Sequence, residues 1–247
     1  MGALTALTVV LLAADTSAAR QSAAGPAPPN TPPRSEASFS QADRLAGAGE
    51  FSRALAVLND LSDANLDRSE LLWRKAYVQI YLGKRAGNES EARAYYRSAL
   101  ADAQAAVQAD GGNAHAHAIH AMAAGRASLT APTKRQRVRL SRQVKTSADR
   151  AIARDPELDI GYHVRGRWHY EIATLGFFTR TVVQVIYGGF PDASLDQAAA
   201  DLTRAVELND RIVHRLHLGI VYEALDARKQ AIEQLERVQE MPARHPE

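Results

Sequence analysis

The sequence predicts an all-α fold in which about five helical hairpins stack into a right-handed solenoid. Three observations support this prediction. Small and apolar residues recur at helical spacing, turn-forming residues interrupt them at regular intervals, and no segment alternates like a strand. The composition agrees, because 46% of the 247 residues are hydrophobic while only 15 are glycine and 10 are proline. The chain can therefore bury one continuous helical core.

The last predicted hairpin carries the clearest repeat pattern. Tetratricopeptide repeats have Leu-Gly, Tyr, Ala and a bulky apolar residue where this chain has Leu218, Gly219, Tyr222, Ala231 and Leu235. In such repeats the small residues let the two helices of a hairpin approach closely, and the larger ones fill the space between neighbouring hairpins. The pattern therefore resembles a tetratricopeptide array.

The predicted helix pairs follow one another in chain order. They are 36–48 with 50–61, 69–83 with 88–109, 113–128 with 133–154, 158–173 with 194–208, and 211–225 with 226–240. The breaks come from Gly83 and Gly87, Gly111 and Gly112, Asp155-Pro156, Asn209-Asp210 and Pro242. Alanines at helical spacing on the second helices predict close contact within each pair.

The N-terminal segment predicts the location of the protein. The apolar run from Ala3 to Ala14, followed by small residues, predicts a secretory signal peptide at 1–19. Since no Lys or Arg precedes the run, a frayed apolar tail is the alternative. The prolines of 20–35 predict a disordered linker, and the tetratricopeptide-like domain is expected at 36–241. We therefore expect an exported protein, in the periplasm of a bacterium.

An apolar insertion lengthens the fourth hairpin, from Thr174 to Ala193. Apolar side chains need a buried location. The segment could be a third helix packed on the surface of the solenoid. It could also be a lid that lines a binding cavity, or a helix that lies on a membrane surface. A full membrane span is not expected, because polar residues near Arg180 interrupt the run.

One stretch of the chain resembles a known family. The signature residues are Gly166, Arg167, Trp168, Tyr170 and Glu171, then Arg180, Tyr187, Gly188 and Pro191, then Glu207, Leu208 and Asn209. Over about residues 69 to 240 the chain resembles the regulator of microtubule dynamics family. The resemblance implies a non-enzymatic helical domain and, for some relatives, a phospholipid-binding cavity and membrane-contact tethering. The predicted signal peptide replaces the organelle anchors of animal relatives, which argues against microtubule binding here.

The repeat frame also selects candidate ligand-binding residues. First helices line the concave groove of tetratricopeptide arrays, and this groove is expected to be mostly apolar with three arginines. The candidates on these helices are Arg74, Tyr81, Met122, Arg126, His163, Arg167 and Tyr170, and the insertion adds Phe177, Phe178, Arg180 and Tyr187. Guanidinium groups hold phosphate or carboxylate, while apolar side chains cover a lipid tail. The main prediction is therefore a lipid-like, apolar or anionic amphiphilic ligand under the insertion.

Two alternatives remain open at this stage. The same groove suits a protein–protein adaptor that binds an extended peptide or a partner helix. Each arginine could instead pair with a neighbouring acid such as Glu171 and only hold the stack in register. An enclosed apolar pocket would favour the lipid, and an open groove with exposed polar groups would favour the peptide.

Other functional classes find little support in the sequence. No metal is expected, because the histidine pairs 117/120 and 214/217 lack further ligands at suitable spacing. No catalytic residues or cofactor are expected, because the sequence has neither a Gly-x-Ser-x-Gly elbow nor a phosphate-binding glycine loop. The net charge of +2 and the lack of aromatic residues within the basic strip 134–150 argue against nucleic acid. That strip is either a solvated face or a site of peripheral membrane contact. The oligomeric state does not follow from the sequence.

Overall fold

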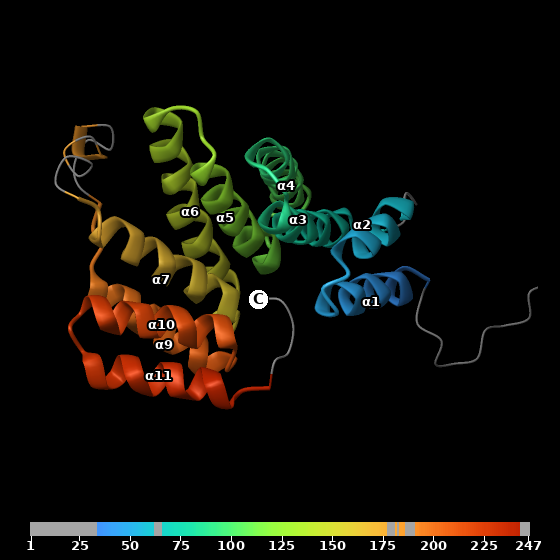
Figure 1. Cartoon of the computed structure of the whole chain (residues 1–247). Helices are drawn as coiled ribbons and strands as arrows, with labels where there is room; N and C mark the ends of the chain where they lie inside the picture. The colour runs from blue at the N-terminus through green and yellow to red at the C-terminus, as the bar shows by residue number, and fades with distance from the viewer. Residues whose placement is uncertain (1–33, 62–65, 177–180, 182, 186–190, 243–247) are drawn as a thin grey trace, which may run out of the picture. The chain divides into compact units, whose positions relative to one another are not determined.

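The fold consists of antiparallel helix pairs that follow one another along the chain (Figure 1). The computed structural model describes residues 34–61, 66–176, 181, 183–185 and 191–242, and this part of the chain contains no strand. The labelled helices are α1 (Arg34–Gly47), α2 (Phe51–Asp60), α3 (Arg68–Arg85), α4 (Glu89–Ala109), α5 (Ala114–Leu129), α6 (Lys134–Arg154), α7 (Asp159–Ala173), α9 (Leu195–Leu208), α10 (Ile212–Ala224) and α11 (Arg228–Glu240). The predicted helices begin and end within two residues of these bounds.

Each helix has the neighbours that a stack of hairpins requires. The pairs are α1 with α2, α3 with α4, α5 with α6, α7 with α9, and α10 with α11. Each second helix also packs against the first helix of the next hairpin, and consecutive first helices lie side by side. The all-α solenoid of helical hairpins is therefore confirmed. The predicted signal peptide and nearly all of the predicted linker lie outside the described residues.

Fully buried alanines form the contacts within the hairpins. Ala54, Ala99, Ala103, Ala106, Ala148, Ala151, Ala198 and Ala205 on the second helices have no exposed surface. Larger residues fill the space between hairpins, as in the cluster where Ile80 of α3 and Ile119 of α5 pack with alanines of α4. Because such clusters span three helices from two hairpins, no hairpin buries its apolar surface alone.

Side-chain caps fix where several helices begin. Asp67, Asn88, Asn113, Thr133 and Ser194 precede their helices and accept hydrogen bonds from backbone N–H groups of the first turn. Each cap satisfies donors that otherwise lack a partner and contributes about 1 kcal/mol. The agreement between predicted and observed helix starts follows from such local signals.

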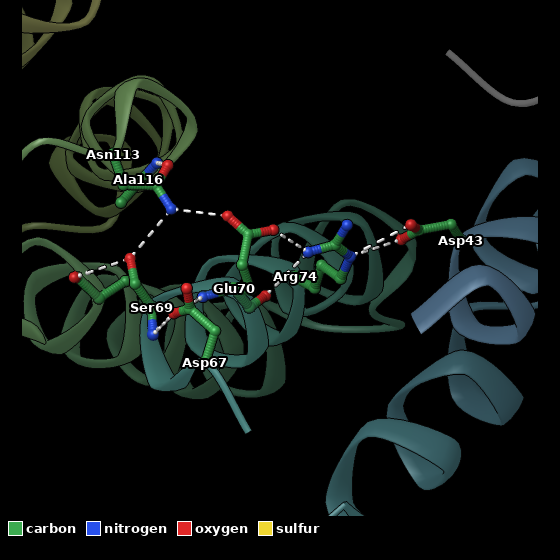
Figure 2. A network of polar contacts seen from close by, with 8 residues as sticks. Asp43, Asp67, Ser69, Glu70, Arg74, Asn113 and Ala116 are labelled. Atoms are coloured by element: carbon green, nitrogen blue, oxygen red, sulfur yellow. Dashed lines mark hydrogen bonds and ion pairs between the residues drawn. The ribbon is translucent and has the colours of Figure 1, made fainter. Parts of the chain in front are cut away.

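A polar network joins the first three hairpins (Figure 2). Arg74 of α3 donates from Nε to both oxygens of Asp43 of α1, at 3.0 and 3.1 Å. It also forms an ion pair with Glu70, whose other oxygen accepts a 2.7 Å hydrogen bond from the Asn113 amide. The same amide donates to Ser69 Oγ at 3.1 Å. The network therefore connects α1, α3 and the start of α5.

The structure describes only part of the insertion between α7 and α9. Residues 177–180, 182 and 186–190 lie outside the described residues. Of the others, Val183 is buried and Val185 is exposed. Among the described residues, no helix is both long and apolar enough to cross a membrane.

Gly166 of α7 lies close to the backbone of α9, its partner in the fourth hairpin. A Cβ atom there would lie 2.9 Å from Leu202 Cγ and 3.2 Å from the Ala198 carbonyl oxygen of α9. The carbonyl belongs to a helix backbone and cannot move aside independently. At Gly125 of α5, by contrast, the nearest atom would be Val144 Cγ2 at an ordinary 3.7 Å.

These two glycines make a matched pair for a stability test. We expect Gly166→Ala to lower the free energy of unfolding by about 1–3 kcal/mol, because the added methyl overpacks the α7–α9 contact. Gly125→Ala should raise it by up to about 1 kcal/mol, because alanine favours the helix. Urea denaturation followed by circular dichroism measures both changes. Equal effects of the two substitutions would contradict the close contact at Gly166.

Candidate functional site

Side chains of α5, α7 and α10 converge where these first helices lie side by side. The group comprises Arg126, His163, Arg167, Glu171, His214 and His217, and is called here the arginine–histidine cluster. The stacking of hairpins produces this convergence, since α7 packs between α5 and α10. Residues about 50 positions apart in the sequence thus come into contact.

A chain of hydrogen bonds runs through the histidines. His214 Nε2 lies 2.9 Å from Asp159 Oδ2, and His214 Nδ1 lies 2.9 Å from His163 Nδ1. The carboxylate can only accept, so His214 Nε2 donates to it. Between the two Nδ1 atoms one nitrogen must donate and the other accept. Exactly one hydrogen is therefore shared at this contact.

The second branch of the cluster joins His217 to Arg167. His217 Nδ1 donates to the Val213 carbonyl oxygen at 2.8 Å, which leaves Nε2 as an acceptor for the Arg167 guanidinium. Arg167 also donates to Glu171 at 2.8 Å. The rings of His163 and His217 meet edge to face, with centroids 5.0 Å apart.

Burial and neighbouring cations keep two of these histidines neutral near pH 7. Burial lowers the pKa of His163 well below its ordinary value, and the nearby His214, His217, Arg167 and Arg211 add to the effect. Burial, followed by the charge of Arg167, lowers the pKa of His217 to about 4. A proton added to either ring would lose hydration and meet positive charge.

Asp159 is the anion at the base of the cluster. Its burial opposes ionisation, but the hydrogen bond from His214 and the charge of Arg211, 3.7 Å away, lower the pKa of its carboxyl group. The carboxylate is therefore charged near neutral pH. It orients His214, and through it His163.

Arg126 has an unusual environment for a guanidinium group. Burial lowers the pKa of Arg126, and the charge of Arg167 lowers it further, while Tyr81, Tyr96 and Glu171 act in the opposite direction. None of the hydrogen bonds or ion pairs between described residues involves Arg126. Beside it, Arg167 has a buried Nε without a hydrogen-bond partner. Two neighbouring guanidinium groups thus retain donors for an anion.

The structure brings together three of the predicted binding residues, namely Arg126, His163 and Arg167. Arg74 lies elsewhere, in the network of Figure 2, where Asp43 and Glu70 neutralise it. Its guanidinium also stacks over the Trp73 ring at 4.2 Å. Arg74 therefore holds hairpins together, as the alternative of acid pairing predicts.

The other described candidates pack in the core. Tyr81 stacks on Phe51 with ring centroids 4.8 Å apart. Met122 packs between the second and third hairpins, and Tyr170 packs against residues of α9 and α10. Phe177, Phe178, Arg180 and Tyr187 lie outside the described residues. The described part of the first-helix surface at the cluster is thus polar, whereas the sequence predicted a mostly apolar groove.

Sequence reasoning missed Asp159, His214 and His217 as parts of this site. None of the predicted binding residues lies on α10, although the spacing of His214 and His217 already placed both on one helix face. No group of three or more histidine, aspartate or glutamate side chains in the described residues is arranged to hold a metal ion.

A hollow of about 690 Å³ lies between α6, α7 and α9, away from the cluster. Among its lining residues is Arg165, which binds both oxygens of Asp201, at 2.8 and 2.7 Å, and reaches Asp149 at 3.2 Å. Lys145 also binds Asp149. The acids here compensate the cations, in contrast to the situation at Arg126.

Comparison with known proteins identifies the family. A model of the family described as Regulator of microtubule dynamics protein 1–3 matches residues 38–247. The chain belongs to this family. Regulator of microtubule dynamics protein 1 from Caenorhabditis elegans is 26% identical over 207 residues, which cover 83% of this chain and 91% of the relative.

Other relatives are longer than this chain. Regulator of microtubule dynamics protein 1 from Bos taurus is 24% identical over 206 residues, which cover 82% of this chain and 64% of the relative. Protein 3 from Xenopus laevis is 27% identical over 142 residues, which cover 58% of this chain and 30% of the relative. The chain thus spans less than two thirds of these two relatives.

The fold also has a solved counterpart. The crystal structure of a thermophilic tetratricopeptide-repeat protein from Thermus thermophilus matches with a TM-score of 0.62 at 17% identity. The match covers 83% of this chain and 90% of that chain. It supports the architecture of a helical-repeat scaffold.

The neutral histidines predict a pH dependence of stability. The folded state lowers the pKa of His163 and His217, so the unfolded chain binds more protons below about pH 6.5. The contribution of these histidines to the free energy of unfolding should be fully present above that pH and decrease as the pH falls toward about 4. The slope approaches about 1.4 kcal/mol per pH unit for each histidine.

Urea denaturation between pH 7.5 and 4.5 measures this slope. His217→Gln should reduce it. His115→Gln is the control, because His115 is exposed and lies outside the cluster. A flat profile in the wild type, or equal slopes in both variants, would exclude the cluster as the origin.

Proposed function

We propose that this member of the regulator of microtubule dynamics family is a non-catalytic adaptor. Its first helices bind a segment of a partner polypeptide, and Arg126 and Arg167 hold an acidic group of that segment. The helical-repeat scaffold supports the proposal, because such scaffolds present extended surfaces to partners. Export to the bacterial periplasm remains a prediction from the N-terminal segment, and the partner would then be an envelope protein.

The observation that carries the proposal is the uncompensated charge of Arg126. Arg126 is partly buried, and a partly buried guanidinium without a counter-ion loses hydration that nothing in the fold replaces. Arg74 in the network of Figure 2 and Arg165 in the hollow have acidic partners, whereas Arg126 has none among the described residues. A carboxylate would supply the missing charge and accept hydrogen bonds from the planar guanidinium.

The surroundings favour a peptide over a lipid. A lipid tail requires an enclosed apolar cavity. Near Arg126 and Arg167 the described side chains include His163, His217 and Glu171, which can bond to a peptide backbone but do not cover an acyl chain. The aromatic residues predicted as the wall of a lipid cavity lie outside the described residues. The peptide is therefore the better candidate.

Selection from a displayed library of random peptides tests the proposal on the full chain. We expect the selected peptides to contain Asp, Glu or a free C-terminal carboxylate, because these groups complement the two guanidinium groups. Arg126→Gln and Arg167→Gln should each weaken binding about tenfold or more, as loss of a charged hydrogen bond does. Fluorescence anisotropy measures the affinities.

The control for this experiment is Arg135→Gln on the exposed side of α6, which should leave binding unchanged. Native mass spectrometry of the purified protein adds a second readout. A lipid that co-purifies with the wild type but not with Arg126→Gln would show that the site binds an amphiphile and not a peptide. Peptides without acidic groups, or equal binding by all three variants, would contradict the assignment of the site.

A second prediction concerns the energetic cost of an unpaired charge. Arg126→Met should raise the free energy of unfolding by about 1 kcal/mol, because methionine keeps much of the packing and removes the desolvated charge. Arg74→Met should lower it by about 1–2 kcal/mol, since Asp43 and Glu70 lose their partner. Urea denaturation at pH 7.5 measures both. A loss of stability in both variants would show that Arg126 is compensated within the fold.

A further inference from the structure

Helix α11 has an outer side, with Ile232 on it, that no other described helix covers. Its inner face packs on α10 through the nearly buried Ala231. On the outer side, Ile232 is 50% exposed, whereas Leu235 is 41% exposed and its side chain lies against Gly219 of α10. In the earlier hairpins the next first helix covers the second helix, but α11 is the last labelled helix (Figure 1). Uncovered ends of repeat arrays are normally polar.

Charged residues surround this apolar position in an ordered way. Arg228, Lys229, Ile232, Glu233 and Glu236 line a shallow hollow of about 540 Å³. Arg228, Ile232 and Glu236 are four apart, as are Lys229 and Glu233, so the five residues form two adjacent rows on the helix. The two cations precede Ile232 and the two acids follow it. The four charged side chains form no hydrogen bond or ion pair with another described residue.

We infer that this face, called here the terminal face and defined by the five lining residues, is an interface between two copies of the chain. A two-fold axis that passes near Ile232 would set the two α11 helices antiparallel. Each Ile232 would then cover the other. Arg228 and Lys229 of each copy would lie opposite Glu233 and Glu236 of the second copy.

The order of charges is what favours a second copy over another partner. An isologous interface must be complementary to itself after a two-fold rotation. A face with cations at one end and acids at the other meets this condition when two such helices run antiparallel. A face of uniform charge would repel its own copy. An unrelated partner would not require the two signs to be separated about a central apolar residue.

The size of the face sets the strength of the association. One half-exposed isoleucine with a charged rim forms much less than the surface of a standard stable interface. The dimer is therefore weak and reversible, with a dissociation constant of about 10–500 µM, and salt weakens it because its rim pairs are exposed. The inference concerns α11 alone, so it stands or falls independently of the peptide site at Arg126.

Charge reversal provides a direct test on the full chain. Arg228→Glu with Lys229→Glu makes the terminal face entirely acidic, and Glu233→Lys with Glu236→Lys makes it entirely basic. Sedimentation velocity up to about 500 µM should show dimers of the wild type and only monomers of each variant. An equimolar mixture of the two variants should restore the dimer. Circular dichroism confirms that both variants are folded.

A crosslinking experiment gives the geometry. The chain has no cysteine, so any disulfide formed by a single-cysteine variant must involve the introduced residue. Ile232→Cys lies near the proposed axis and should form a disulfide-linked dimer under mild oxidation, because its Cα atoms can approach within about 7 Å. Ser98→Cys, exposed on α4, is the matched control and should crosslink much more slowly.

Three outcomes would overturn the inference. The wild type could remain monomeric throughout the concentration range, as it would if another segment or protein covers the face. The charge-reversal variants could dimerise as well as the wild type, or their mixture could stay monomeric. Ser98→Cys could crosslink as fast as Ile232→Cys.

Discussion

The close approach of the two helices within each hairpin is the constraint on which the rest of the structure depends. Alanines with no exposed surface line the second helices, and at Gly166 even a methyl group would collide with α9. At these contacts a small residue on one helix makes room for the other helix, as Gly166 does for Leu202. Large residues such as Ile80 and Ile119 point toward the neighbouring hairpin, where they form a cluster that spans three helices. Close packing within hairpins thus enforces stacking between them.

Stacking, in turn, determines which polar residues meet. It places α3, α5, α7 and α10 side by side, so residues from distant parts of the sequence share one environment. The two resulting networks differ in charge. In the network of Figure 2 the guanidinium of Arg74 lies between two carboxylates. In the arginine–histidine cluster Asp159 binds His214 and Glu171 binds Arg167. No described acid forms an ion pair with Arg126. The Arg74 network connects hairpins with its charges paired, whereas the arginine–histidine cluster leaves the charge of Arg126 without an acidic partner.

The sequence predicted the helices closely because their determinants are local. Periodicity, caps such as Asn113 and breaks such as Asp155-Pro156 act within one turn of helix. The site depends on partners that local patterns do not encode. Arg74 has the same spacing as a groove residue, yet its partner Asp43 lies 31 positions upstream. His214 meets His163 only because α7 and α10 are adjacent in space. Repeat spacing therefore locates a surface but does not say which of its charges the fold has neutralised.

Compensation of charge separates structural from functional positions across the described part of this chain. Arg165 has two acidic partners and Arg74 has two, and both lie between elements that they connect. Arg126 and the terminal face lack such partners, and they lie at the two kinds of surface that a stack of hairpins leaves open. These are the side of the first helices and the end of the array. The unpaired charge weakens the isolated chain where it is partly buried, as at Arg126, whereas the exposed charges of the terminal face stay hydrated. In the functions proposed here the complement comes from another molecule, a partner segment at Arg126 and a second copy at the terminal face.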